Sequence, residues 1–386
     1  MKKTTVYATF AAILLLPLSY LNPLFPGDYK FDHLWFFAYI TVILLTWSAN
    51  ITDRSAFKFY DALILAPLLG LSLLTGISAF MTGEFKPFLF YIYALLAFLV
   101  ILTPPPPVAN QTNTTKFFFL VTLLGAALGT LLPDLTNEQG RYKFLFPSPT
   151  VFSVWLIACY ALFIMENPHR LTKYAAFAAT SLICLMTDTR LSIAFLPIVL
   201  IYTFINRPFR TSTYAFLYTM TTIMLGSLYY VYGILSKHAG VEQIHHSHEI
   251  STDNSYETRT YLFDITFNSF NQSDWTHKIF GIGAESARNE VIKTAGIDLL
   301  PHSDFMRILH DFGFLGLALH LTLIYLLSRH TRTSQVLGLL TLTAFMHNMI
   351  YSYFLILALI VSYTLTPPLS RQEHYILGQH NNNQHA

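Results

Sequence analysis

Long apolar runs recur along most of the chain, separated by short polar or charged stretches. A helix needs about 20 mostly apolar residues to cross the hydrocarbon core of a bilayer. The sequence therefore predicts an all-α integral membrane protein with about twelve transmembrane helices. The expected spans are residues 4–21, 32–49, 60–81, 87–103, 116–132, 149–165, 171–187, 191–205, 213–235, 312–328, 335–349 and 351–366.

The composition excludes several other classes of protein. Charged residues make up 11% of the chain and hydrophobic residues 53%, whereas soluble globular proteins carry about 25% charged residues. The net charge of +2 is too balanced for a nucleic-acid-binding surface, so we expect no nucleic acid as a partner. The two cysteines, Cys159 and Cys184, lie in apolar runs, where buried and inert thiols are expected rather than a disulfide framework.

The distribution of Lys and Arg predicts the orientation. With both termini inside, the inner segments hold twelve of these residues and the short outer loops hold five, as the positive-inside rule requires. We expect a nine-helix membrane region over 1–235, a long outer loop over 236–311, three C-terminal membrane helices over 312–366 and a disordered inner tail over 367–386. Loops as long as 236–311 are usually functional, and short helices are expected within it.

The first informative stretch of the long loop centres on Arg259. Tyr261, Leu262, Ile265 and Phe267 form a rough helical stripe, and Arg259 lies near the start of that helix. A cation is disfavoured at the beginning of a helix, which indicates another partner for this arginine. The alternative is a surface arginine on an amphipathic helix that lies on the membrane. Gly281-Ile282-Gly283 predicts a tight turn that closes the unit.

The second stretch starts at His302. Ser303 can cap a helix that begins just after His302, and the following apolar residues fall at helical spacing. Gly313 and Gly316 permit a bend or close packing where the chain re-enters the membrane. His302 is thereby expected at a fixed helix start on the outer side. A lone histidine in such a place is otherwise a structural hydrogen-bonding residue.

Together these motifs resemble the O-antigen ligase and O-antigen polymerase family of bacterial membrane proteins. The resemblance rests on His302-Ser303 followed by Gly313-x-x-Gly316, on the Arg259 unit before it, and on Thr189-Arg190 at the outer start of a span, where the family usually has Ser-Arg. It covers roughly residues 187–316. The charge count independently places Arg190, Arg259 and His302 on the same side of the membrane.

The resemblance implies an inner-membrane enzyme with a GT-C-like fold, whose site faces the periplasm. Such enzymes transfer a glycan from undecaprenyl pyrophosphate without a metal ion or other cofactor. Arg190 and Arg259 would bind the diphosphate, because the guanidinium group binds phosphate oxygens bidentately and stays charged. His302 would remove the proton of the acceptor hydroxyl as general base. Membrane lipid surrounds the protein, and a polymerase would have a chain-length regulator as a further partner.

Further residues have two interpretations each. Arg141, in the outer loop 133–148, can contact glycan or phosphate or be structural. Asp304 and Arg307 can line the acceptor side, although Arg307 can instead pair with Asp311 four residues later. His320 lies within a span, where we favour a hydrogen bond to a neighbouring helix over a catalytic role. The remaining candidates, of low weight as ligands or bases, are His245, His246, His248, His310 and His347.

Two activities share the motifs. A polymerase joins lipid-linked repeat units to one another, whereas a ligase moves the finished glycan onto a lipid A-core acceptor, and the sequence favours the polymerase only slightly. The rival class is a secondary transporter, which would need ionisable residues deep in its spans. Here those residues gather at the outer face. A scaffold protein is the third class, and it would not depend on His302 or Arg259.

Overall fold

The computed structural model describes most of the predicted membrane helices and part of the long outer loop. The two predicted spans at 4–21 and 32–49 and the predicted tail at 367–386 lie outside the described residues. So do His302 and the histidines at 245–248. The described residues are 59–101, 119–120, 123–124, 126–127, 141–143, 148–166, 170–205, 208–238, 255–299, 301, 303–329, 331–345, 355–356, 358–360 and 362.

Within these ranges the regular structure is helical, as the sequence predicts. The helices are α3 (Phe59–Thr82), α4 (Lys86–Ile101), α6 (Pro149–Glu166), α7 (Arg170–Met186), α8 (Arg190–Phe204), α9 (Thr211–His238), α10 (Ser255–Gln272), α11 (Trp275–Phe280), α12 (Ser286–Ala295), α13 (Asp304–Ser328) and α14 (Arg332–Ala344).

Most of these helices coincide with predicted spans. The bounds of α3, α4, α6, α7 and α8 agree with the apolar runs to within two residues. Two of the described helices, α3 and α13, are long and apolar enough to cross a membrane, and shorter apolar helices lie at Lys86–Leu99, Pro149–Ile164 and Ser192–Tyr202. The twelve-span topology stays a prediction, because several of its runs fall outside the described part of the chain.

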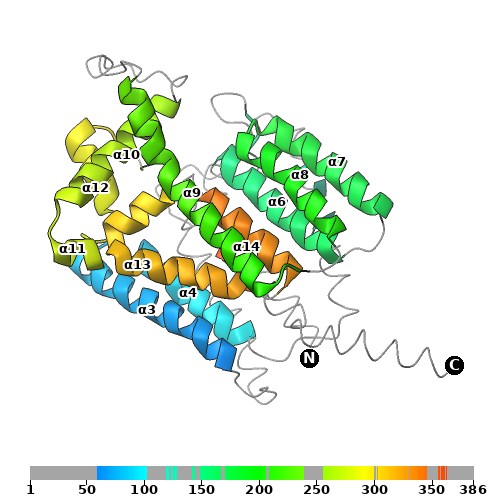
Figure 1. The fold of residues 1–386 in the computed structure, drawn as a ribbon, viewed down its shortest axis with the longest axis horizontal. Coiled ribbons are helices and arrows are strands. Elements are labelled where there is room, and N and C mark those ends of the chain that lie inside the picture. The colour runs from blue at the N-terminus through cyan, green and yellow to red at the C-terminus, as the bar shows by residue number, and fades with distance from the viewer. Residues whose placement is uncertain are drawn as a thin grey trace, which may run out of the picture.

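The helices pack in two groups that share one core. Figure 1 shows α6, α7 and α8 side by side on one flank, and α3, α4 and α13 on the other. Helix α14 contacts α6 and α8 on one side and α13 on the other, and therefore joins the groups. Both free cysteines are buried in the first group, as expected. In the second, the hydroxyl of Tyr91 on α4 lies 2.7 Å from Nδ1 of His320, which confirms the predicted helix-to-helix hydrogen bond.

Helix α13 combines two predicted elements. The sequence predicts a capped helix just after His302, a bend near Gly313 and a span from residue 312, and the structure joins them in one helix that begins at Asp304 and changes direction at Gly313. Phe345, just after α14, packs against Phe305 and His320. The centroid of its ring lies 5.1 Å from that of Phe305 and 5.3 Å from that of His320. A straight helix would hold positions 305 and 320 about 22 Å apart. The first segment of α13, residues 304–312, is therefore folded back over the bundle, and Figure 1 shows the corner beside α11.

Candidate functional site at the start of α13

One end of the bundle gathers the elements that carry the predicted site residues. The backbone N–H of Asp304 donates to the carbonyl of Phe345, which puts the start of α13 at the end of α14. Near the start of α8, Ser192 donates to Ser153 of α6 at 2.5 Å. Arg332, at the start of α14, donates to the carbonyl of Ile205 just after the end of α8, and α8 packs on α14, so these two helices run in opposite directions. The starts of α8 and α13 therefore lie at the same end of the bundle.

The start of α13 is fixed by its cap and by burial. Ser303 has an extended backbone, and its side chain accepts a hydrogen bond from the N–H of Met306 at 3.4 Å, which confirms the predicted cap. Ser303 and Asp304 are both almost fully buried. His302, the predicted base, precedes this cap and lies outside the described residues. Its role stays a prediction.

The corner at Gly313 is held by direct contact between two backbones. Gly313 has a φ of 68° and Gly281 a φ of 86°, a region that L-residues with a side chain rarely adopt. A Cβ at Gly281 would lie 2.2 Å from the carbonyl oxygen of Asp311, and one at Gly313 would lie 2.3 Å from that of Ile279. The N–H of Gly283 donates to the same Asp311 carbonyl at 3.0 Å. The predicted tight turn and the predicted bend are thus two sides of one joint.

Helix α10 runs beside the first segment of α13 in the same direction. Phe263 packs on Met306, Ser269 lies 3.2 Å from Nε2 of His310, and Phe270 packs edge-on against Phe314. The partners in these three pairs are 41 to 44 positions apart in the chain. The same offset puts Arg259 level with the start of α13.

Arg259 is the predicted site residue that the structure describes most informatively. Helix α10 begins at Ser255, so Arg259 lies in its second turn rather than its first. The side chain is partly buried. Its Nε is shielded from solvent and has no hydrogen-bond partner within the described part of the chain. A shielded guanidinium nitrogen without a partner is costly unless an anion completes it.

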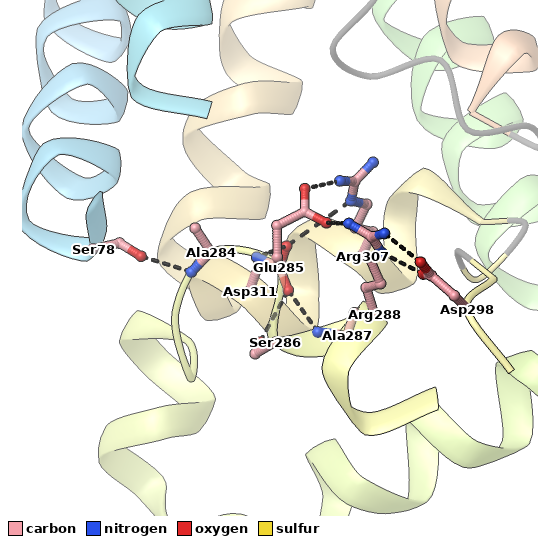
Figure 2. Close-up of polar contacts among 9 residues, drawn as sticks. All are labelled: Ser78, Ala284, Glu285, Ser286, Ala287, Arg288, Asp298, Arg307 and Asp311. Carbon is pink, nitrogen blue, oxygen red and sulfur yellow. Dashed lines mark hydrogen bonds and ion pairs between the residues drawn. The ribbon is translucent and has the colours of Figure 1, made fainter. Parts of the chain in front are cut away.

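A second cluster of charge lies between α12 and α13 (Figure 2). Arg307, which is 3% exposed, forms an ion pair with Glu285, which is 7% exposed. Asp311, one turn further along α13, lies 4.0 Å from Nε of Arg307. Arg307 was predicted to line the acceptor side or to pair with Asp311. The structure confirms the ion pair with Asp311 and adds a closer one with Glu285, a residue that the sequence did not single out.

Asp311 also caps the start of α12. One oxygen accepts from the N–H of Ala287 and from the hydroxyl of Ser286, and the other accepts from the N–H of Glu285, all at 2.9 to 3.1 Å. His310 lies between Ser286, 2.8 Å away, and Ser269. Figure 2 shows the turn from Ala284 to Ala287 wrapped around this carboxylate. Asp311 and His310 therefore join α10 and α12 to α13.

The outer side of α12 carries an exposed ion pair. Arg288 donates to both oxygens of Asp298 at 2.6 Å. These hydrogen bonds hold the pKa of the Asp298 carboxyl below its usual value. On the other side of the turn, the N–H of Ala284 donates to Ser78 of α3 at 2.7 Å. The segment from α10 to α12 is thus fastened to both α3 and α13.

The start of α8 belongs to the same end of the molecule. Helix α8 begins at Arg190, whose side chain lies outside what the structure describes. The turn before it, 187–189, accepts hydrogen bonds from Arg141. Arg141 was predicted to contact glycan or phosphate or to be structural, and here it contacts protein backbone. Among the described residues no group of His, Cys, Asp and Glu is arranged to hold a metal ion.

Residues 175–321 match the family model whose description is O-Antigen ligase. This region of the chain is similar to the O-antigen ligase family. The O-antigen ligase region extends from α7 to the middle of α13, and so includes Arg190, Arg259, His302 and the glycine joint. The comparison with curated proteins found no match.

Sequence patterns did not indicate a role for Glu285 or Ser286 in the O-antigen ligase region. Glu285 has a φ of 61°, a conformation unusual for a residue with a side chain. Its ion pair joins positions 22 residues apart on separate elements, and no local pattern reports such a pair. The one available signal was the position of Glu285 shortly after Gly281-Ile282-Gly283, where a tight turn exposes backbone N–H groups that need a partner.

Proposed function

We propose that this protein transfers a glycan from a polyprenyl diphosphate carrier to an acceptor hydroxyl at the outer, periplasmic face of a bacterial inner membrane. The observation that carries the proposal is the shielded Nε of Arg259, which lacks a hydrogen-bond partner among the described residues and lies level with the start of α13. Further support comes from the match of residues 175–321 to the O-antigen ligase model. A multiply charged diphosphate is an anion of the kind that such an arginine binds.

In this proposal Arg259 and Arg190 bind the diphosphate and stabilise the charge that develops on it as the leaving group departs. Arginine suits this role because its planar fork binds phosphate oxygens bidentately and does not lose its proton. The donor already carries a good leaving group, so the proposed reaction needs neither a nucleotide nor a metal ion.

The acceptor hydroxyl needs a base because it is a weak nucleophile. We assign this role to His302, because the unperturbed pKa of a histidine lies near the working pH. General base catalysis contributes typically 10²- to 10⁴-fold to a rate. Support comes from the capped and buried residues Ser303 and Asp304, which give the chain after His302 a fixed direction. Direct attack by the activated hydroxyl would invert the configuration at the anomeric carbon.

We propose that the acceptor is a second lipid-linked repeat unit, so that the protein polymerises a surface polysaccharide such as O-antigen or capsule. The second candidate is transfer of the finished glycan to lipid A-core, which the description of the matched family favours. Arg259 and His302 would have the same roles in both activities, which differ only in the acceptor.

The test is complementation of a deletion strain, followed by a gel of its surface glycans. Wild type, His302→Ala, Arg259→Ala and Arg259→Lys are compared at equal protein levels, with Lys293→Ala as the control. Lys293 is 78% exposed on α12 and belongs to no part of the proposed machinery. We expect the control to restore the ladder and both alanine variants to lose it.

The deletion strain distinguishes the two acceptors. Lipid A-core with a single repeat unit means a polymerase, whereas bare lipid A-core with long glycan on its polyprenyl carrier means a ligase. A wild-type ladder from His302→Ala removes His302 as the base. A wild-type ladder from both His302→Ala and Arg259→Ala overturns the proposed transferase mechanism.

A further inference from the structure

Arg141 makes three hydrogen bonds to the turn that leads into α8. Its Nε donates to the carbonyl of Thr187 at 3.0 Å, and one terminal nitrogen donates to the carbonyl of Asp188 at 2.8 Å and to the hydroxyl of Thr189 at 3.3 Å. The planar guanidinium group fits this pattern, because its fixed fork reaches two neighbouring carbonyls at once. A lysine, with a single ammonium group, cannot reproduce it.

The turn needs such support from outside. Asp188 has a φ of 46°, and the left-handed conformation costs a residue with a side chain about 1–2 kcal/mol. Thr189 occupies the N-cap position of α8, yet its side chain makes no capping hydrogen bond. Its hydroxyl instead donates to the carbonyl of Thr187 at 3.3 Å. Asp188 lies just beyond the end of α7, where carbonyl groups favour a nearby cation.

Arg141 is itself held in place through its neighbour. The N–H of Tyr142 donates to the carbonyl of Met186 at 3.0 Å. Its hydroxyl donates to the carbonyl of Ala126 at 2.5 Å, and its ring packs edge-on against Phe152 of α6. The pair 141–142 therefore bridges the end of α7 and the start of α6, and presents the guanidinium group to the turn from a fixed base.

We propose that Arg141 is a positioning residue, which holds Asp188 in the left-handed conformation and so sets the direction in which α8 and Arg190 begin. The inference rests on the proposed function, in which Arg190 binds the donor diphosphate. It assigns Arg141 a contact with the protein backbone instead of the predicted contact with the substrate.

The deciding experiment uses Asp188→Gly as a suppressor. Glycine adopts the left-handed region without the steric cost of a Cβ, so it allows the turn to form without Arg141. The full-length protein is reconstituted in liposomes, and steady-state kinetics are measured with a synthetic polyprenyl-diphosphate-linked donor for Arg141→Ala, Arg141→Lys, Asp188→Gly and the double variant Arg141→Ala/Asp188→Gly.

We expect both Arg141 variants to raise the KM for the donor by on the order of 10- to 100-fold, the scale of a misplacement of about 1 Å. Asp188→Gly alone should resemble wild type, and the double variant should recover most of the loss. Wild-type kinetics for Arg141→Ala would overturn the inference. So would a double variant as defective as Arg141→Ala, because a direct contact with the donor cannot be restored by a change in the turn.

A second measurement separates this inference from the proposed function. Amide hydrogen exchange over residues 186–190 reports the turn without any substrate. Arg141→Ala should exchange faster there, and the double variant should return towards wild type. If Arg190→Ala keeps full activity, the proposed role of Arg190 fails, while the exchange result still decides whether Arg141 holds the turn. Unchanged exchange in Arg141→Ala contradicts the inference.

Discussion

At the joint between Gly281 and Gly313, neither of the two backbone segments has room for a side chain at the glycine. Each glycine has a positive φ, and a Cβ on either would lie within 2.3 Å of a carbonyl oxygen of the other segment. The contact brings the outer segment against the corner of α13. It therefore fixes where α11 and α12 begin relative to the bundle.

We expect Gly281→Ala and Gly313→Ala to lower the thermal unfolding midpoint in detergent far more than Gly296→Ala. Gly296 is a matched control, because its φ is 70° and a Cβ there would meet no atom within 4 Å. The Gly296→Ala variant should lose only the conformational cost of a Cβ in the left-handed region, about 1–2 kcal/mol. Equal losses at positions 281, 313 and 296 would show that the two backbones are not in contact.

The buried pair of Glu285 and Arg307 predicts a large cost when only one charge is removed. Glu285→Gln leaves the Arg307 guanidinium buried without its main partner, and breaking such a pair costs about 3–5 kcal/mol. The matched control is Glu290→Gln on the same side of the joint, because its ion pair with the exposed Lys293 is worth less than about 1 kcal/mol. Urea unfolding in detergent measures both. A double variant Glu285→Gln/Arg307→Met that is more stable than Glu285→Gln alone would confirm that the cost comes from the stranded charge.

Helices α10 and α13 show what hydropathy can and cannot predict. The apolar stripe of α10 was visible in the sequence because its residues repeat at helical spacing. The first segment of α13 was visible too, because Ser303 can cap it and its apolar residues repeat at helical spacing. The burial of its charged side chains was not predictable. Arg307 pairs with Glu285 and Asp311 accepts from the start of α12, and local patterns do not report such contacts. The side-by-side register of the two helices likewise follows from contacts 41 to 44 positions apart.

The packing of Phe263 on Met306 should hold α10 against α13. Phe263→Ala removes a buried aromatic ring and should cost about 3–5 kcal/mol of local stability. Hydrogen exchange measured by mass spectrometry over residues 255–272 should rise in this variant. Asn268→Ala, at an exposed position of the same helix, is the control and should leave exchange unchanged. If the two variants exchange alike, this contact does not hold α10 in place.

At the level of the whole molecule, the sequence predicted the described helices of the bundle well because apolar runs of this length leave the backbone few alternatives. The way these helices meet was not predictable from the runs. Arg141 illustrates this. The sequence showed only that it is an arginine, a residue type that binds phosphate, in a loop. Its actual partners are carbonyl groups 46 and 47 positions away, so its role depends on which helix ends come together.

The predicted orientation can be tested with single cysteines. Lys293→Cys on α12 should react with a membrane-impermeant thiol reagent from the outside of intact spheroplasts, because we expect α10 to α12 to face outward. Arg210→Cys, in the exposed connection between α8 and α9, should react only after the membrane is permeabilised. The native cysteines are both buried and serve as an internal control. Labelling of Arg210→Cys in intact spheroplasts would reverse the predicted topology.

The shared direction of α10 and the first segment of α13 also constrains how the protein is made. Two neighbouring helices in one chain can run the same way only if the chain between them travels back, and here α11 and α12 lie in that return. Arg259 is synthesised more than forty residues before the start of α13, beside which it lies. A nascent chain that ends before residue 301 therefore contains Arg259 but lacks the first segment of α13 beside which it lies. The arrangement proposed to bind the donor can form only after α13 has emerged from the ribosome.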